Sequence, residues 1–419
     1  MGLTMSEKRS VVREKAVRYR KAGKKEKTAI LDEVVELTGY NRCYGSQLLS
    51  GDGRRLRVGS KTTIVGDATK KTSRHKRDAF YDREVLEALK KIWMILDYIC
   101  GKRLQPALKD VLEQLERNGE LQVTSEVRKK LLGISAATID RLLAEERKKL
   151  MLKGRSRTRR GTLLKNQIPI RTFSDWNEKQ PGFVELDLVA HDGGSSSGDF
   201  CQTLDVTDIC TGWTETEGVR NKAQVWVFEA LKRIRSRLPF QLLGIDSDNG
   251  GEFINSYLVE YCGKQRITFT RARPYRKNDN CFVEEKNNSV VRRNVGYLRH
   301  DTQQELEVLN RLYSYLRLYT NHFLPVMKLV SKQREGARVS KKHDRAQTPY
   351  QRLLASGVLS ASEKRQLFKQ HRQLNPAQLK REITALQEKL MKLANSKRDS
   401  VMRSTVKRSS GRERTKRVA

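Results

Sequence analysis

The order of helices and strands expected between residues 181 and 325 constrains the fold of this chain most strongly. Three strand patterns follow one another directly, in PGFVELDLVAHDG, DFCQTLDVTDICTGW and TETEGV. They are followed in turn by an amphipathic helix, the apolar strand FQLLGID, a second helix, the strand ITFTRA and two further helices. Adjacent strands followed by alternating helices and strands predict an α/β domain with a mixed sheet flanked by helices.

Carboxylates gather where these strands end. The stretch DSDNGGEF, residues 246–253, contains three of them at a junction between a strand and a helix. Asp187 lies within the apolar strand VELDLVA, and Glu284 and Glu285 lie at the start of a helix. The helix dipole accounts for an acidic residue near a helix start. It does not account for an Asp in an apolar strand, where a buried carboxylate needs a partner.

Convergence of Asp187, Asp248 and Glu284 would give these carboxylates a common function. Several carboxylate oxygens at one edge of a sheet suit Mg²⁺ or Mn²⁺ better than zinc. Two such ions, bound about 4 Å apart, hold the attacking and leaving oxygens of an in-line phosphoryl transfer. The residues alone leave an alternative open at each position: Asp192, Asp246 and Glu285.

The charge of the chain indicates a polyanionic partner. There are 85 Lys and Arg residues against 49 Asp and Glu residues, which gives a formal net charge of +36. A surface this positive binds phosphate backbones. A membrane partner is not expected, because the sequence has no apolar run of spanning length and no secretory signal core. Six scattered cysteines without a CxxC pair are expected to be reduced thiols in a cytoplasmic protein, not zinc ligands.

Two helical hairpins precede the α/β domain. In the first, a periodic helix ends at the turn TGY, residues 38–40, and a second helix follows with Asn41 as its expected N-cap. In the second, within residues 124–150, two helices flank a Gly-Ile-Ser turn, and Ser135 is the expected N-cap. Helices joined by a short glycine-bearing turn fit a helix-turn-helix, and two of them in a basic chain favour DNA binding.

The composition along the chain predicts a multidomain protein in which basic linkers separate helical modules from the α/β core. The expected parts are an N-terminal helix-turn-helix at 1–50, a basic linker at 51–78, a second helical DNA-binding module at 79–150, a second basic linker at 151–180, the α/β core at 181–325, a small basic C-terminal domain with a terminal helix at 326–394 and a basic, disordered tail at 395–419.

The strand Asp, the stretch SDNGGEF and the Glu of NCFVEEKNN together resemble a known catalytic core. It is that of retroviral-type integrases and of the integrase-like DDE transposases of bacterial insertion sequences. In that family the Glu often lies 35 residues beyond the second Asp, and 35 residues separate Asp248 from Glu284 here. The resemblance covers roughly 181–325. It selects Asp187, Asp248 and Glu284 as the catalytic and metal-binding residues.

The resemblance also implies a fold and an activity. The fold is ribonuclease H-like, a five-stranded mixed sheet with helices on both sides, which agrees with the strand count above. The activity is that of a transposase: metal-assisted hydrolysis frees a 3′-OH at each end of a mobile element, and each 3′-OH then attacks target DNA. Mg²⁺ or Mn²⁺, two ions, double-stranded DNA and a homo-multimer are implied. No His₂Cys₂ zinc module is visible, which favours a bacterial transposase, associated with the nucleoid, over a retroelement integrase.

Basic and capping residues near the helical turns and the acidic cluster are the candidate DNA contacts. Lys286 and Arg293 are seven residues apart, so they share one face if the helix is regular. Arginines in the loop before that helix and in the second basic linker are placed to contact phosphates. The full set is Asn41, Arg42, Ser135, Arg141, Arg159, Arg160, Arg273, Arg276, Lys286 and Arg293.

Two other functions remain open from the sequence. One is a DNA-binding regulator derived from a mobile element, which would need no catalysis; the loss of an acidic residue would mark it, and all three are present. The other is a ribonuclease H-like nuclease that hydrolyses without joining. Two helix-turn-helix candidates favour recognition of particular duplex sites, which a general nuclease does not need.

Overall fold

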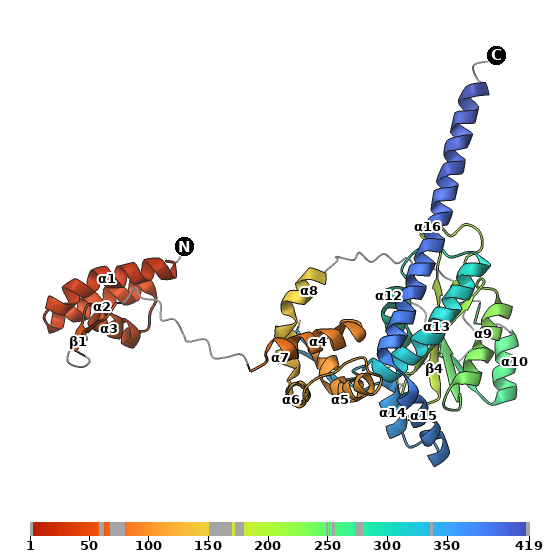
Figure 1. Ribbon diagram of the computed structural model, residues 1–419, viewed down its shortest axis with the longest axis horizontal. Helices are drawn as coiled ribbons and strands as arrows, with labels where there is room; N and C mark the ends of the chain where they lie inside the picture. The colour runs from red at the N-terminus through yellow and green to blue at the C-terminus, as the bar shows by residue number, and fades with distance from the viewer. Residues whose placement is uncertain are drawn as a thin grey trace. The chain divides into compact units, whose positions relative to one another are not determined.

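The chain divides into two compact units, Met1–Phe80 and Tyr81–Ala419. A computed structural model describes residues 3–57, 63–67, 80–150, 170–171, 180–248, 250, 252–253, 256–272, 280–335 and 338–415 (Figure 1). Among these residues, no helix is long and apolar enough to cross a membrane.

The first unit is a three-helix domain followed by a hairpin. Helix α2 is followed by its C-cap Gly39, which adopts a left-handed conformation (φ 65°), and α3 begins after the N-cap Asn41. Val12, Val34 and Leu49, one from each helix, are fully buried in its core. The hairpin lies in the range predicted as a linker. A hydrogen bond from Gly53 N to the Gly66 carbonyl joins the ends of its two strands. The elements are α1 (Met5–Lys21), α2 (Lys24–Thr38), α3 (Arg42–Gly51), β1 (Arg55–Arg57) and β2 (Thr63–Val65).

The second unit begins with five helices that form a helical block. Helices α4 and α5 are strongly amphipathic, and their apolar faces supply Trp93, Leu104 and Leu108 to a buried cluster. The Ser135 hydroxyl accepts a hydrogen bond from Thr138 N, which confirms the expected N-cap of α7. The helices are α4 (Arg83–Ile95), α5 (Gly101–Arg117), α6 (Ser125–Gly133), α7 (Ala136–Leu142) and α8 (Ala144–Leu150).

A mixed sheet forms the centre of the second unit. The order is β3-β8-β7-β4-β5-β6, with β4, β5 and β6 antiparallel and the remaining pairs parallel. The five strands expected from the sequence are all present, and β3, from the range predicted as a linker, adds a short edge strand. The strands are β3 (Ile170–Arg171), β4 (Phe183–Ala190), β5 (Gln202–Asp208), β6 (Thr214–Val219), β7 (Gly244–Ser247) and β8 (Thr268–Ala272).

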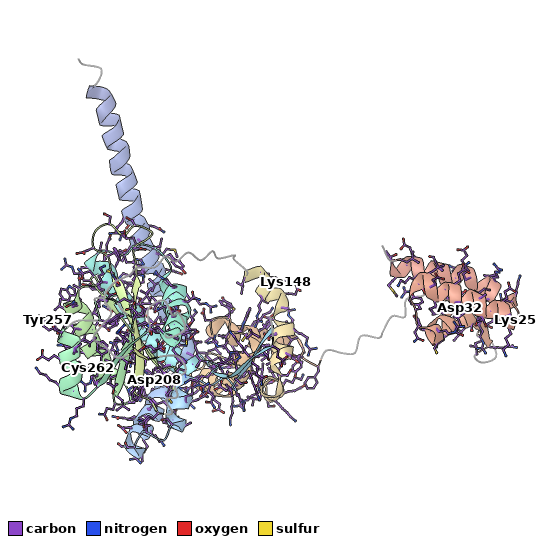
Figure 2. All side chains as sticks on the ribbon, turned by 180° about the vertical axis from the view of Figure 1, so that it is seen from behind. Lys25, Asp32, Lys148, Asp208, Tyr257 and Cys262 are labelled. Atoms are coloured by element: carbon purple, nitrogen blue, oxygen red, sulfur yellow. The ribbon has the colours of Figure 1, made fainter. Side chains whose placement is uncertain are left out.

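Helices cover both faces of this sheet (Figure 1). On one face, Val184 and Leu186 of β4 pack with residues of α9 and α10, among them the buried Cys262 labelled in Figure 2. On the other face, α11 packs against β4 and β5, and α13 packs against β6. Because side chains alternate along a strand, the odd-numbered residues of β4 point to the second face. The helices are α9 (Gln224–Arg237), α10 (Ser256–Gln265), α11 (Cys281–Lys286), the π-helical turn η2 (Asn287–Arg292), α12 (Arg293–Val295) and α13 (Gln303–Phe323).

The C-terminal region is more regular than its composition indicated. An antiparallel hairpin is followed by two short helices and by a long helix that packs along α13. That helix continues to Thr415, through most of the range predicted as a disordered tail. The elements are β9 (Leu329–Glu335), β10 (Arg338–His343), α14 (Pro349–Ala355), α15 (Ala361–Gln373) and α16 (Pro376–Thr415).

One buried cluster joins three ranges that were expected to be separate domains. Leu89 of the helical block, Leu312 of α13 and Ile383 of α16 all belong to it and are fully buried. The structure therefore groups most of the range 79–150, from Tyr81 onward, with 181–325 and 326–394 in one compact unit, and boundaries within that unit stay predictions.

Candidate active site

Acidic side chains form two rows on the sheet face that α11 covers. Glu185 of β4 lies directly opposite Asp246 of the parallel neighbour β7. Asp187 lies two residues further along β4, so it follows Glu185 on the same face. Asp248 directly follows β7, and its charge raises the pKa of Asp187. We call Glu185 and Asp246 the inner row and Asp187 and Asp248 the outer row. The outer row is formed by two of the three residues expected to be catalytic.

Asp187 is held by neighbouring hydrogen-bond donors. Its Oδ2 accepts from Asn287 Nδ2 at 2.5 Å, and its Oδ1 accepts from Leu188 N at 2.8 Å. Burial and the negative charge of Asp248 raise the pKa of Asp187 to about 7, and the charge of Glu284 adds to this. Ionised Asp187 is therefore in electrostatic conflict with both of the other residues expected to be catalytic.

Asp248 lies directly after β7, where the chain turns. Its Oδ1 accepts a hydrogen bond from Gly250 N at 2.9 Å. Burial raises the pKa of Asp248, and the nearby charge of Glu252 raises it further, against the effect of the Gly250 N–H. This turn holds Asp248 in a place where it repels Asp187 electrostatically.

Glu284 lies on α11, the short helix that crosses the acidic face. Its side chain is exposed, and its charge raises the pKa of both Asp187 and Glu185. The three residues expected to be catalytic are thus electrostatic neighbours.

The donor set of this cluster fits a divalent cation in its chemistry, since oxygen ligands with unrelieved negative charge suit Mg²⁺ and Mn²⁺. The cluster does not yet form a closed coordination sphere. In the described part of the chain, no three His, Cys, Asp or Glu side chains are gathered closely enough to hold a metal ion. Side-chain movement within the cluster would therefore have to accompany metal binding.

The inner row is more deeply buried than the outer row. Glu185 and Asp246 are 0% exposed. The Oε2 of Glu185 accepts from Val283 N at 2.8 Å, and Asp246 Oδ1 accepts from Thr270 Oγ1 at 2.5 Å. Burial raises the pKa of Glu185 well above its usual value, and the Val283 N–H opposes that rise. Asp246, considered in the sequence as an alternative to Asp248, thus lies in the inner row and is fully buried.

The sequence did not indicate a role for three residues near Asp187, which are Glu185, Asp205 and Asn287. Asp205 of β5 lies opposite Asp187 and is fully buried, and Asn287 begins the π-helical turn η2. Among the described residues, Asp205 Oδ2, Asn287 Oδ1 and Glu185 Oε1 are buried oxygens without a hydrogen-bond partner. The i, i+2 pattern of ELD and DSD could have indicated the two rows, but the cross-strand position of Asp205 depends on strand register.

Four of the candidate DNA contacts have local structural roles. Asn41 Oδ1 accepts from Cys43 N at 2.9 Å, which confirms its role as the N-cap of α3. Arg42 forms an ion pair with Asp32 of α2, and Arg141 bonds back to Thr138 of its own helix. Ser135 caps α7, as described above. Contact of these side chains with DNA stays a prediction.

The expected common face of Lys286 and Arg293 is wrong. The π-helical turn η2 lies between them and changes the rotation per residue. Lys286 is 5% exposed and pairs with Glu285 at 2.8 Å, whereas Arg293 is exposed and lies 3.4 Å from Asp97 of the helical block. Lys286 is thus directed into the protein and is not available on the surface for a phosphate. Four further candidates lie outside the described residues: Arg159, Arg160, Arg273 and Arg276.

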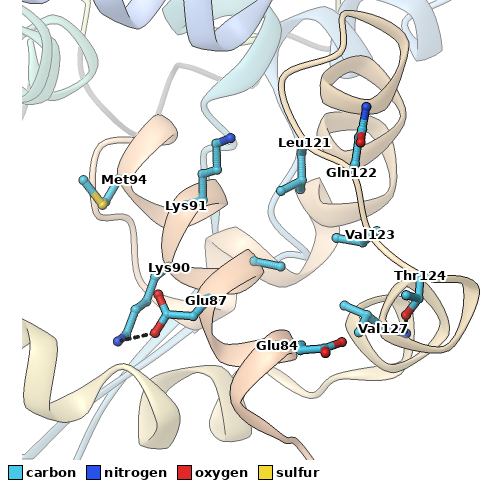
Figure 3. A pocket seen from close by; sticks show the side chains of 11 residues that line it. Glu84, Glu87, Lys90, Lys91, Met94, Leu121, Gln122, Val123, Thr124 and Val127 are labelled. Carbon is cyan, nitrogen blue, oxygen red and sulfur yellow. Dashed lines mark hydrogen bonds and ion pairs between the residues drawn. The ribbon is translucent and has the colours of Figure 1, made fainter.

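A separate surface pocket of about 580 Å³ lies between α4, α6 and the segment that precedes α6 (Figure 3). Glu87 and Lys90 form an ion pair at its rim, and Met94 and Leu121 give it an apolar part. None of the acidic residues described above lines it, so it is not part of the candidate active site.

Comparisons with known proteins give one clear relative. No family model matches the chain. The chain is 41% identical over 343 residues to the uncharacterised protein y4rM of Sinorhizobium fredii (strain NBRC 101917 / NGR234), which covers 81% of this chain and 93% of y4rM. Among solved structures, it is similar to the catalytic core domain of BIV integrase, with 19% identity, 42% of this chain and 95% of that chain covered and a TM-score of 0.29. It is also similar to the HTLV-2 integrase catalytic core domain in complex with magnesium, dimeric form, with 14% identity, 35% and 91% covered and a TM-score of 0.27.

Proposed function

This chain belongs to the family of the uncharacterised protein y4rM, and from its own candidate active site we propose that it is a DNA transposase of the DDE type. In this proposal the protein binds the ends of its mobile element and cleaves them by metal-assisted hydrolysis, which frees 3′-OH ends. Each 3′-OH then attacks a phosphodiester of target DNA, so that one P–O bond forms as another breaks. No covalent bond to the protein is required.

The mutual electrostatic influence of Asp187, Asp248 and Glu284 carries this proposal. Asp248 and Glu284 both raise the pKa of Asp187, although Asp187 lies in β4, Asp248 follows β7 and Glu284 lies in α11. A fold gains nothing in stability from gathering like charges in a partly buried place. Strongly perturbed carboxylates of this kind are typical of functional sites.

Asp187, Asp248 and Glu284 are the residues that would hold Mg²⁺ or Mn²⁺, and we propose two ions. When bound, the ions would activate water for hydrolysis and stabilise the charge that develops on the attacked phosphate. Asn287 donates to Asp187 Oδ2 and so orients that carboxylate before any ligand arrives. Gly250 N does the same for Asp248.

Other parts of the chain would supply recognition of DNA. The helical pairs α2–α3 and α6–α7 are proposed as helix-turn-helix modules that read the element's ends. The formal charge of +36 would hold the phosphate backbones of element and target together. Pairing of the two ends of the element implies a homo-multimer. We propose that the protein acts in the bacterial cytoplasm, at the nucleoid.

The test is a strand-joining reaction with the purified full chain. A donor plasmid carrying the DNA that flanks this gene is incubated with a target plasmid and Mg²⁺ or Mn²⁺, and new junctions are sequenced. Asp248→Asn and Glu284→Gln are run beside the wild type. With metal, we expect the wild type to give junctions with a constant donor end. The yield of junctions should fall at least about 1,000-fold in both variants, because loss of a residue that stabilises the transition state lowers the reaction rate by factors of this size.

The other outcomes assign the protein elsewhere. Nicks or double-strand breaks without junctions would favour a nuclease. Specific binding to the flanking DNA, without cleavage and unchanged in both variants, would leave a DNA-binding regulator derived from a mobile element.

A further inference from the structure

Helix α11, which carries Glu284, begins without a cap of its own. Its N-cap residue, Asn280, makes no side-chain hydrogen bond to the first turn of the helix. The first N–H groups of a helix lack partners within the helix and need acceptors from elsewhere. Because α11 spans only Cys281–Lys286 before the π-helical turn begins, its position depends on contacts outside the helix.

Strand β4 supplies the missing acceptor through Glu185. Its Oε2 accepts from Val283 N at 2.8 Å, within the first turn of α11, and the side chain is 0% exposed. A carboxylate in this position also interacts favourably with the positive end of a helix. Glu185 therefore links the strand that carries Asp187 directly to the residue preceding Glu284.

Asn280 extends this connection to β7. With its amide nitrogen toward Asp246, it donates to Asp246 Oδ2 at 3.1 Å and accepts from Asp248 N at 3.2 Å. The inner row of acids is thus bonded to the start of α11 from both strands. The outer row and Glu284 are each no more than two residues from one of these bonds.

We propose that Glu185 is a positioning residue, which caps α11 from β4 and so fixes Glu284 relative to Asp187 and Asp248. This inference rests on the proposed function for its consequence, since those three residues are the proposed metal ligands. Glu185 itself touches neither metal nor DNA in this scheme. Its effect is carried through the Val283 N–H, and it is lost when the acceptor oxygen is lost.

The experiment compares Glu185→Ala with Glu185→Gln in the full chain. Glutamine keeps an oxygen for the Val283 N–H, whereas alanine removes it. Mn²⁺ alone is the probe, and its affinity is measured by electron paramagnetic resonance without DNA. Loss of an outer-shell partner typically weakens metal affinity about 10–100-fold. We expect a loss of that size for Glu185→Ala and a change within about 3-fold for Glu185→Gln.

Hydrogen exchange gives a second readout that does not depend on metal or activity. We expect faster amide exchange across residues 281–286 in Glu185→Ala and wild-type exchange in Glu185→Gln. Glu215→Ala is the matched control, because Glu215 is an equally buried carboxylate of the same sheet that accepts from Trp213, Arg237 and Arg317, away from α11. It should lower stability without changing the Mn²⁺ affinity of folded protein or the exchange of 281–286.

The outcomes separate this inference from the proposed function. Unchanged Mn²⁺ affinity and unchanged exchange of 281–286 in Glu185→Ala would overturn the positioning role. Equal losses in Glu185→Ala and Glu185→Gln would also overturn it, because the acceptor oxygen would not be the cause. If wild type neither binds Mn²⁺ nor joins strands, the proposed function fails. Faster exchange in Glu185→Ala alone would then still support the capping of α11.

Discussion

Ionisation of the Asp187 carboxyl group destabilises the folded state. Its pKa is raised to about 7 by burial and by the charges of Asp248 and Glu284. In an unfolded chain the pKa of an Asp is about 3.9. The folded state therefore binds a proton more tightly, and the stability that this provides is complete at low pH and lost as pH rises through 7.

Replacement of Asp187 by Asn should consequently stabilise the metal-free protein at alkaline pH. We expect Asp187→Asn to raise the free energy of unfolding at pH 8 by roughly 2–4 kcal/mol, since each pKa unit corresponds to about 1.4 kcal/mol. The gain should shrink as pH falls below 7 and vanish near pH 4. Urea unfolding with a chelator at several pH values measures it.

The control for this prediction is Asp192→Asn. Asp192 lies just beyond the same strand, where its side chain accepts from Gly194 N in an exposed turn. A gain from Asp187→Asn that does not vary with pH would contradict the electrostatic explanation. Added Mg²⁺ should reverse the order and favour wild type, because the ion would bind the ionised Asp187.

At the scale of elements, Glu305 connects the start of α13 to α16. Its carboxylate is fully buried and completes a capping box with Thr302. It also accepts from His300 Nδ1 at 3.1 Å and from Lys397 Nζ of α16 at 2.6 Å. Burial by itself would raise the pKa of Glu305, but the hydrogen bonds from His300, Lys397 and Thr302 outweigh it and lower the pKa to about 2.

Glu305→Gln should destabilise the second unit at neutral pH. We expect a loss of about 3 kcal/mol, because the substitution disrupts a fully buried carboxylate that accepts hydrogen bonds from His300, Lys397 and Thr302. Since the pKa of Glu305 is lowered, its contribution is present above about pH 4.5 and lost as pH falls through 2. Chemical unfolding at pH 7 tests this, with Glu307→Gln, an exposed neighbour on α13, as the control. Equal effects of both substitutions would contradict a role for the buried network.

The molecule as a whole contains two compact units with separate cores. Among its described residues, the first unit has six in its buried cluster, so its stability should be modest. Leu49 of that cluster is fully buried. We expect calorimetry to resolve two transitions, of which Leu49→Ala lowers only one, by about 10 °C or more, because burial loss of this kind costs about 2–5 kcal/mol.

The matching substitution in the second unit is at Leu89, which is fully buried in the large cluster of that unit. Leu89→Ala should lower the other transition and leave the first in place. A single transition that both substitutions move together would show that the units unfold cooperatively, against the division described above.

The net charge of +36 also belongs to the whole molecule. If six to ten phosphates are neutralised on binding, DNA affinity should fall about 10³–10⁵-fold between 50 and 200 mM salt. Fluorescence anisotropy with the full chain and a labelled duplex measures the slope. A shallow slope would mean that most of the basic residues stay away from the DNA.

Much of the fold and the outer acidic residues could be predicted from the sequence because they depend on local order. Alternation in VELDLVA, the apolar run before DSDNGG and the helix pattern after them each identify an element without knowledge of its neighbours. Asn41 and Ser135 were predicted as caps for the same reason, since a cap acts within three residues of its own position.

Only the tertiary structure shows which contacts these helices and strands make with one another. The pairing of Glu185 with Asp246 and the position of Asp205 opposite Asp187 depend on strand register. The capping of α11 from β4 depends on a contact between residues 98 positions apart. The π-helical turn that follows the buried Lys286, and the cluster that joins the helical block to the rest of the second unit, likewise arise from packing. The sequence by itself determined which residues could carry the chemistry, because residue type and period are local. The hydrogen bonds and strand pairings that hold those residues in place were decided by the tertiary structure, because they connect different elements.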